Sequence, residues 1–413
     1  MATGSDQEFG QRFGIDPIAL QGRRVLIIVE NLPVPFDRRV WQEARTLHAA
    51  GAEVSVICPM AGEWTALYEM IEGVHIYRHP LNADGGGARA YLKEYLAALY
   101  WQTRLAWRVW RERGFDTIQG CNPPDLVFLV AAPFRLMGKR YIFDHHDLNP
   151  ELYEAKFGKR GFFWHALRIA ERLNFLTASV VISTNDSYRR IALERGRKRP
   201  EDVFVVRSGP DLSRMRPVPP NPVWRGDGRF LIGYLGVMGE QEGIDLLLEA
   251  VRILVRERGR DDVRFVLVGG GPALADLRAL SARMGLEGYV RFTGRASDAD
   301  LLEVLSTADL CVNPDRVTPM NDLSTMNKIL EYMAMGKPIV QFEVTEGRVS
   351  AGAASLYAAP NDPADLAAKI ETLLEDPELR ASMGRHGQAR VARDLHWGGS
   401  VAPLLNAYLR VAR

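Results

Sequence analysis

Two charged side chains stand three residues apart within residues 321–340 and suggest an anion-binding role. Lys328 and Glu331 fall on neighbouring positions of one face of a predicted helix. Small polar residues precede this helix, and we expect Ser324 or Thr325 to cap its N-terminus. The first N–H groups of a helix have no partner within it, so this end can hold an anion such as phosphate. The alternative is an ordinary capped, amphipathic helix.

Residues 143–151, FDHHDLNPE, form the densest polar cluster at a predicted strand end. His145 and His146 beside carboxylates raise the possibility of a metal site. Consecutive strand residues point to opposite faces, however, so two adjacent histidines rarely reach one ion. A hydrogen-bonding or electrostatic role for one histidine is favoured. Residues 298–300 form a DxD pattern, but Ser297 and the first aspartate suit a helix cap better than a metal.

Glycines 269–271 follow a predicted strand and precede a helix, so their N–H groups can cradle a phosphate. The third glycine of a GxGxxG dinucleotide fingerprint falls on Leu274, so that fingerprint is absent. Residues 294–296 are a second small-residue strand end, and a tight turn is the alternative for both. There is no GxSxG elbow, no cysteine beside a histidine and no P-loop, so nucleophilic catalysis lacks support.

The elements that must position these residues alternate between apolar strands and helices, which predicts α/β structure. The pattern divides at a proline-rich, aperiodic stretch typical of a linker. We predict two doubly wound, Rossmann-like domains that face a cleft, with ligands beyond the carboxyl ends of the strands. The predicted boundaries are a leader at 1–21, a first domain at 22–210, a linker at 211–229 and a second domain at 230–395.

The composition is that of a globular protein that stays in the cytosol. Of 413 residues, 47% are hydrophobic, and the net charge of +1 gives no reason to expect nucleic acid. Cys58, Cys121 and Cys311 are far apart, which argues against a disulfide framework and favours a reducing compartment. The N-terminus lacks the apolar core of a signal peptide, and no run reaches the roughly 20 apolar residues of a spanning helix.

Residues 156–168 mix basic and aromatic side chains, KFGKRGFFWHALR. Aromatic rings at headgroup depth with cations against anionic lipid would give peripheral contact with a membrane. The alternative is a core-facing aromatic stripe with a solvated basic face, and the sequence leaves both open.

Seven stretches in order across both halves resemble the retaining, family-4-type glycosyltransferases with the GT-B fold. The similarity is greater to the bacterial branch that adds sugars in surface-polysaccharide and lipid-linked oligosaccharide synthesis. The stretches are NLPVPFDRRVWQEARTL (31–47), FDHHDLNPELYEAKFG (143–158), VRSGPDLSRMRP (206–217), YLGVMGEQEGID (234–245), LVGGGP (267–272), FTGRAS (292–297) and STMNKILEYMAMGKPIV (324–340).

The resemblance implies that a sugar passes with retention from a nucleotide sugar, here a UDP-sugar, to a hydroxyl of a lipid-linked or glycan acceptor. It implies neither a metal nor a cofactor, and a last helix at 396–413 that crosses back to the first domain. Glu331 is expected to bind the ribose, and His146 is expected to lie near the donor sugar. The backbone near the base and phosphates is expected to come from Gly270, Gly271 and Arg295. Further donor contacts are expected from the polar start of the helix, at Ser324, Thr325 and Asn327. Acceptor contacts are expected from Asn31, Pro35, Phe36 and Asp147, and from Arg38 and Arg39 unless these two only face solvent.

Two departures from the family pattern stand out. The first glutamate of its EX7E motif falls on Leu323, and Asp322 beside it is the candidate replacement. The Arg and Lys that clamp the diphosphate fall on Val237 and Glu242. Charge that develops on the leaving group needs cations or N–H dipoles, for which Lys328 is the first candidate and Arg207 the second.

Three other functions stay open. Because of these departures, the chain could be a weakened GT-B scaffold that only binds a nucleotide sugar or a partner. A nucleotide-sugar epimerase or hydrolase would use the same fold and consume the donor without an acceptor. A nicotinamide-dependent oxidoreductase is disfavoured, because the GxGxxG pattern fails.

Overall fold

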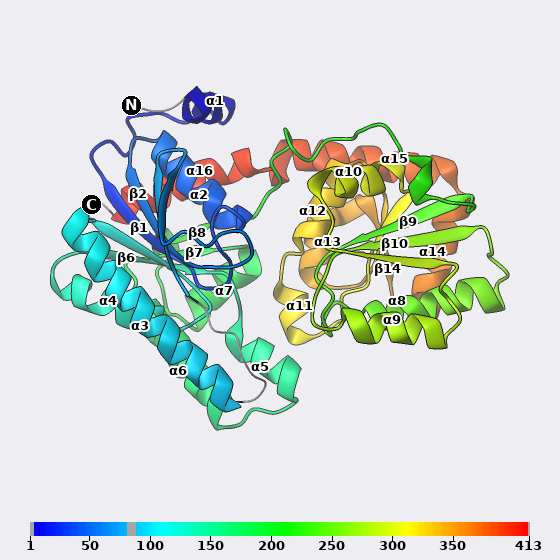
Figure 1. Cartoon of the computed structure of the whole chain (residues 1–413), viewed down its shortest axis with the longest axis horizontal. Helices are drawn as coiled ribbons and strands as arrows, with labels where there is room; N and C mark the ends of the chain where they lie inside the picture. Colours follow the sequence, from blue (N-terminus) through cyan, green and yellow to red (C-terminus); the bar gives the residue numbers. More distant parts are fainter. Residues whose placement is uncertain (1–3, 81–87, 412–413) are drawn as a thin grey trace. The chain divides into compact units, whose positions relative to one another are not determined.

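The protein, described here by a computed structural model that covers residues 4–80 and 88–411, divides into two compact α/β units (Figure 1). Unit 1 comprises Met1–Ser208 and Ser400–Arg413, and unit 2 comprises Gly209–Gly399. Each unit is built on its own sheet of mostly parallel strands. Two such units confirm the predicted fold class.

Eight strands form the sheet of unit 1: β1 (Arg24–Ile28), β2 (Glu53–Pro59), β3 (Tyr68–Ile71), β4 (Val74–His79), β5 (Thr117–Cys121), β6 (Arg140–His145), β7 (Val180–Ser183) and β8 (Val203–Val205). Their order is β3-β4-β2-β1-β5-β6-β7-β8, and every pairing except β3 with β4 is parallel. The central strands are buried on both faces, which explains their continuous Val, Ile and Leu runs.

Helices cover the sheet of unit 1: α1 (Gly4–Arg12), α2 (Arg38–Ala49), α3 (Ala88–Glu112), α4 (Val127–Leu136), α5 (Asn149–Phe157), α6 (Phe162–Thr177), α7 (Asp186–Glu194) and most of α16 (Trp397–Val411). Asp37 caps α2, since its side chain accepts the Val40 N–H. The last helix does return to unit 1, where the Tyr408 hydroxyl lies 2.5 Å from Gln119 Oε1 on β5.

Six strands form the sheet of unit 2: β9 (Phe230–Leu235), β10 (Val263–Val268), β11 (Val290–Gly294), β12 (Leu310–Asn313), β13 (Ile339–Phe342) and β14 (Ser355–Ala358). Their order is β11-β10-β9-β12-β13-β14, all parallel. The helices are α8 (Ile244–Arg252), α9 (Leu274–Arg283), α10 (Asp298–Thr307), α11 (Pro319–Leu323), α12 (Asn327–Ala334), α13 (Thr345–Ala351), α14 (Pro363–Glu375) and α15 (Pro377–Arg390). Two clusters of buried hydrophobic side chains flank this sheet.

Each sheet has a point where the strand order reverses, between β1 and β5 in unit 1 and between β9 and β12 in unit 2. In open α/β sheets, ligands bind beyond the carboxyl ends of the strands at such a switch point. The two switch points therefore mark where functional side chains are expected.

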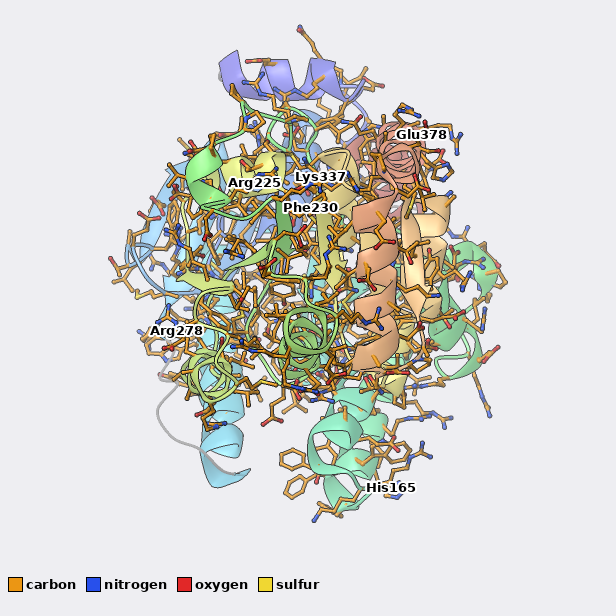
Figure 2. All side chains as sticks on the ribbon, turned by 90° about the vertical axis from the view of Figure 1, so that its right-hand side faces the viewer. His165, Arg225, Phe230, Arg278, Lys337 and Glu378 are labelled. Carbon is orange, nitrogen blue, oxygen red and sulfur yellow. The ribbon has the colours of Figure 1, made fainter. Side chains whose placement is uncertain are left out.

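Two stretches are more ordered than the sequence predicted. Within residues 1–21, expected to form a loose leader, α1 buries Phe9 beneath the guanidinium of Arg45 on α2. Residues 211–229, expected to form a linker, pack on unit 2 instead. The Trp224 indole donates to Glu303 of α10, and Arg225, labelled in Figure 2, pairs with an aspartate beside β12.

Candidate active site

Arg39, at the start of α2, lies at the centre of a buried polar cluster in unit 1. Its guanidinium nitrogens contact His146 Nε2 (2.9 Å), Val206 O (2.7 Å), Ser208 Oγ (3.0 Å), Asp144 Oδ1 (3.0 Å) and Glu43 Oε1 (3.1 Å). Four of these contacts are hydrogen bonds, and the contact with Glu43 is an ion pair. The prediction that Arg39 meets an anionic acceptor or faces solvent is therefore wrong, because Arg39 is 8% exposed and fully engaged by its own chain.

Two buried carboxyl groups share the Arg39 cation but differ in charge. Burial and the nearby Asp144 charge raise the pKa of Glu43 to about 8. Burial also opposes ionisation of Asp144, but Arg39 and His146 outweigh it and hold the pKa of Asp144 below its usual range. The Gln119 amide donates to both, at 2.6 Å to Glu43 and 2.8 Å to Asp144. Near neutral pH, Asp144 is ionised and Glu43 is largely protonated.

The two adjacent histidines lie in different surroundings. His145 is buried among Phe143, Phe175 and Tyr188, and burial lowers its pKa to about 3. His146 places Nε2 at 2.8 Å from Asp144 Oδ2. Burial disfavours its charged form, yet the Asp144 carboxylate prevails and raises the pKa of His146. His146 is therefore the histidine available for chemistry.

Cys121, Asp144 and His146 bring their ligand atoms within 4.8 Å of one another, a spacing that a metal ion could bridge. The surrounding groups fit a metal poorly. The Arg39 guanidinium already binds Asp144 and His146, and burial raises the pKa of the Cys121 thiol well above its usual value. The cluster is better described as a hydrogen-bonded network around an arginine.

The predicted acceptor-side residues surround the start of α2. Asn31 hydrogen-bonds the Asp147 carboxylate, whose pKa is raised by burial. Phe36 is 42% exposed, and Arg38 is also exposed. The loop that carries Pro35 is held in place by the buried Arg78, which donates to the carbonyl of the preceding residue, Val34, at 2.6 Å. Asn31, Pro35, Phe36, Arg38 and Asp147 thus belong to one region beside His146.

In unit 2, Lys328 occupies the switch point between β9 and β12. Its Nζ lies 2.7 Å from Asp315 Oδ1, just past β12, and 3.5 Å from the hydroxyl of Tyr234 on β9. Tyr332, on the same helix, receives the Leu235 N–H at 2.7 Å and lies 3.2 Å from the Val312 carbonyl. Helix α12 is thereby fixed to both strands that flank the switch point.

Asp315 was not predicted from the sequence as a site residue. Burial opposes a charge on Lys328, but the Asp315 carboxylate outweighs it and raises the pKa of the lysine. Glu242, in the loop after β9, also raises the pKa of Lys328 through its negative charge. Burial raises the pKa of Glu242 itself. Asp315 Oδ2 is buried without a hydrogen-bond partner in the described part of the chain. The only sequence signal for Asp315 was a carboxylate two residues past a buried strand.

The stretch before α12 differs from its prediction. Met326, not Ser324 or Thr325, precedes the helix, and Ser324 Oγ donates back to the carbonyl of Met320 at 2.8 Å. Asp322 accepts the N–H and the hydroxyl of Thr345, at 2.7 and 3.0 Å. Asp322 therefore caps α13, a local role that differs from the predicted contact with a donor sugar.

The glycine turn after β10 packs backbone against backbone. Gly269 has φ +140°, and a side chain there would collide with the Gly236 carbonyl. The Met238 N–H donates to the Gly270 carbonyl at 3.0 Å, and a Cβ at Gly270 would lie 3.8 Å from the Arg295 nitrogen. The N–H groups of Gly270 and Gly271 donate to no group within the described residues. They are therefore not used by the described part of the chain, and their contact with a ligand stays a prediction.

The remaining donor residues divide between the units. Asn327 is exposed and Glu331 half-buried on α12, in the same helix as Lys328. Arg207 lies in unit 1, where it pairs with Asp186 at 2.8 Å. The structure thus brings Lys328, Asn327 and Glu331 together and assigns Arg207 to the other unit.

These two sheets, each with polar side chains at a switch point, define a two-domain α/β protein of the GT-B type. The chain belongs to the glycosyltransferases of this type. Residues 37–209 match the glycosyl transferase 4-like domain, and residues 229–376 match the domain of glycosyl transferases group 1. This confirms the resemblance to the family-4-type enzymes.

Individual proteins agree with this assignment. Over 162 residues, the chain is 33% identical to alpha-D-kanosaminyltransferase from Streptomyces kanamyceticus, which covers 39% of this chain and 40% of that protein. The chain thus spans about two fifths of the length of this curated relative. Sucrose-phosphate synthase from Thermosynechococcus elongatus is similar in fold, with a TM-score of 0.79 at 18% identity over 94% of this chain and 99% of that chain. HepE from Anabaena, in complex with UDP and glucose, gives a TM-score of 0.68 at 18% identity over 94% and 98%.

Proposed function

We propose that this protein is a retaining, metal-independent glycosyltransferase that moves a sugar from a UDP-sugar to a lipid-linked or other glycan acceptor. The observation that carries the proposal is the partly buried Lys328 at the switch point of the group 1 domain. HepE, which shares the fold, binds UDP and glucose, and the similar Streptomyces protein is a glycosyltransferase by name. UDP is thereby the first nucleotide to test.

In the proposed reaction the acceptor hydroxyl attacks the anomeric carbon on the face that the nucleotide leaves. The bond from this carbon to the diphosphate oxygen breaks, and a bond to the acceptor oxygen forms. The acceptor's proton passes to the departing phosphate oxygen. Negative charge grows on the leaving group, so a cation and N–H dipoles aimed at it lower the barrier. Lys328 and the N–H groups of Gly270 and Gly271 would supply them.

The functional test combines binding with product formation. We expect UDP-sugars to raise the melting temperature above that seen with GDP-, ADP- or TDP-sugars, because a ligand of the native state stabilises it. Incubation with the stabilising donor and a lipid-linked acceptor should release UDP and give a glycosylated product with the donor's anomeric configuration. Inverted product, or donor consumption that needs no acceptor, would contradict the proposal.

Lys328→Ala tests the residue on which the proposal rests. We expect the turnover rate to fall by about 10²–10³, the usual cost of removing one group that stabilises developing charge. Lys369→Ala is the matched control, because this lysine is 37% exposed on α14 and its ion pair within the described residues is with Asp365. Full activity of Lys328→Ala would show that another group supports the leaving phosphate.

A second candidate, a scaffold that binds a nucleotide sugar without transferring it, has its own structural support. Glu242 puts an acid where the family pattern has a cation, and the Asp322 carboxylate is engaged by Thr345. A scaffold would show the same thermal shift with UDP-sugars but release no UDP with any acceptor. The two candidates therefore separate in one experiment.

We further propose that unit 1 contacts an anionic bilayer, which would place the enzyme at the inner face of the cell membrane. One face of α6 carries exposed apolar residues at alternating spacings of four and three: Phe162, Ala166, Ile169, Leu173 and Leu176. Phe157 and Phe163 extend this face toward α5. This exposed apolar face extends beyond the segment 156–168 for which the sequence suggested membrane contact.

Charge favours a membrane over a second copy of the chain as the occupant of this face. Lys159, Arg160 and Arg172 are exposed along the same stretch, as is His165 (Figure 2). Its acidic residue, Glu171, is buried and paired with Arg195. A basic border repels a second basic border but attracts anionic headgroups. In the described part of the chain, no helix is long and apolar enough to cross a membrane.

Vesicle sedimentation tests this contact. The protein should bind vesicles of phosphatidylglycerol and phosphatidylcholine more strongly than vesicles of phosphatidylcholine alone. Ile169→Asn with Leu173→Asn should weaken binding at least about tenfold, because two exposed apolar side chains no longer enter the bilayer. Val223→Asn, an exposed change in unit 2, is the control. A solution dimer that the double variant abolishes would instead assign this face to self-association.

A further inference from the structure

One ring nitrogen of His146 faces two groups with opposite requirements. The Nε–H of Arg39 points at Nε2 from 2.9 Å, and this contact needs an unprotonated nitrogen. Asp144 Oδ2 lies 2.8 Å from the same Nε2, and that contact needs an N–H. An imidazole nitrogen carries either a lone pair or a proton in its ring plane, so only one of the two hydrogen bonds can form at a time.

The other ring nitrogen is open. Nδ1 of His146 has no hydrogen-bond partner in the described part of the chain and is not among its buried unpartnered polar atoms. It is therefore the nitrogen that a ligand beside His146 would meet.

The ring has three forms, and Arg39 disfavours one of them. In the neutral form with the proton on Nδ1, Nε2 accepts from Arg39. In the charged form, Nε2–H donates to Asp144 and Nδ1 keeps its proton, and the attraction between the ring charge and Asp144 offsets the contact between the N–H groups of Arg39 and His146. In the neutral form with the proton on Nε2, the same two N–H groups face each other without that offset, and the arginine hydrogen loses its acceptor. Asp144 Oδ2 keeps the Gln119 donor in either neutral form, so the two neutral forms differ mainly in the Arg39 contact. Both favoured forms carry a proton on Nδ1.

We propose that Arg39 is a positioning residue that keeps Nδ1 of His146 a hydrogen-bond donor, whether the ring is neutral or charged. This inference rests on the proposed glycosyl transfer, in which the open face of His146 would meet a sugar oxygen. The remaining N–H groups of Arg39 hold Val206 and Ser208, the end of the first unit-1 segment, so the same guanidinium aligns this segment with the histidine.

Several ionisable groups surround His146 and enter any pH profile. They are Arg39 and Glu43 on α2, Cys121 on β5, Asp144 and His145 on β6, and Asp147 in the following loop. A comparison of two variants at each pH cancels their shared effects.

Arg39→Lys removes the Nε–H aimed at the ring but keeps the positive charge beside the two carboxyls. The neutral ring can then move its proton to Nε2, donate to Asp144 and lose the Nδ1 donor. The ratio of wild-type to Arg39→Lys turnover should stay near about 2 at pH 6 and rise to about tenfold at pH 9, the loss of one hydrogen bond. Ser208→Ala, which removes a different contact of the same guanidinium, should show no such rise. A ratio that is constant with pH would overturn the proposal.

Nitrogen NMR gives a readout independent of catalysis and of the variant's folding. The wild-type protein labelled with ¹⁵N-histidine contains eight histidines, and His146→Gln identifies the signal of interest. Above the pH at which His146 titrates, its Nε2 should have the shift of an unprotonated nitrogen and Nδ1 that of an N–H. The reverse pattern would overturn the inference. Absence of transfer with every donor would defeat the proposed function but leave this result intact.

Discussion

At the scale of single residues, the buried acid Glu43 in the Arg39 cluster makes the stability of the folded protein depend on pH. Its pKa of about 8 in the folded protein exceeds the ordinary value of 4.5 that applies when the chain unfolds. Between these values the folded chain holds a proton that the unfolded chain has released. Stability from this group is thus complete below pH 4.5 and declines as the pH rises toward 8.

Glu43→Gln should remove this decline. We expect the free energy of unfolding of the variant, relative to the wild type, to increase from pH 5 to pH 8.5. The raised pKa of His146 acts in the same direction above 6.5 but is present in both proteins, so it largely cancels. Urea unfolding at three pH values measures the difference. An unchanged difference would mean that Glu43 is ionised in the folded protein.

Single residues were also where the sequence was least informative. Strand ends indicated that His146 and the loop before α2 lie near a site, because parallel strands align their carboxyl ends. The fate of Arg39 could not be predicted, since its carboxylate partner Asp144 is 105 positions away in the chain. Asp315 was missed for a different reason: it is only 13 positions from Lys328, but their pairing depends on how α12 docks. Long-range pairing of polar groups leaves no periodic pattern.

At the scale of elements, α12 is fixed to its sheet by one buried hydroxyl. The Tyr332 oxygen receives the Leu235 N–H on β9 and lies within reach of the β12 carbonyl at Val312. The helix that carries Lys328 is therefore aligned with the switch point by a side chain one turn further along it.

Tyr332→Phe should lower the free energy of unfolding by about 1–3 kcal/mol, because a buried N–H loses its acceptor. It should also weaken donor binding if the alignment of α12 positions Lys328. Tyr289→Phe is the control, since the Tyr289 hydroxyl makes no hydrogen bond within the described residues, and the variant keeps the ring that packs on two arginines and on the core of unit 2. Urea unfolding and thermal shifts with UDP-sugars provide both measurements. Equal effects of the two variants would mean that the hydroxyl contributes nothing specific.

Elements with a strong apolar pattern were predicted well, and irregular ones were not. The strand predicted before the glycines at 269–271 is β10, because a strand buried on both faces must be apolar throughout. The break at residues 324–326 was missed, since the capping potential of Ser324 and Thr325 pointed to a continuous start. Proline content suggested a linker at 211–229, but Leu212 and Met215 pack against the core of unit 2.

At the scale of the whole molecule, unit 1 is discontinuous in the chain. Its sheet comes from the first 208 residues, but α16 completes it from the far end. Tyr408 hydrogen-bonds Gln119 on β5, Arg410 pairs with Asp202 before β8 at 2.9 Å, and Ser400 donates to the Arg207 carbonyl at 2.8 Å. The helix is thus an integral part of unit 1.

Leu404→Ala tests this dependence. Leu404 is buried on α16, and its truncation should cost about 2–5 kcal/mol of unfolding free energy. Leu409, 40% exposed on the same helix, is the matched position, and Leu409→Ala should change stability by less than about 1 kcal/mol. Hydrogen exchange should place the loss in β5 and β6. A loss confined to unit 2 would contradict the assignment of α16.

Because α16 belongs to unit 1, unit 1 cannot be completed until the end of the chain has been synthesised. A ribosome must make all of Gly209–Gly399 after the eight strands of unit 1 have emerged and before the helix that completes them exists. At about 5–20 residues per second, that interval lasts on the order of 10–40 s. During this interval, the surface of β5 around Gln119 is not yet covered by Tyr408. Unit 2, although synthesised later than the sheet of unit 1, can therefore complete its folding first. The nascent first unit is therefore the stage at which chaperones would have most to protect.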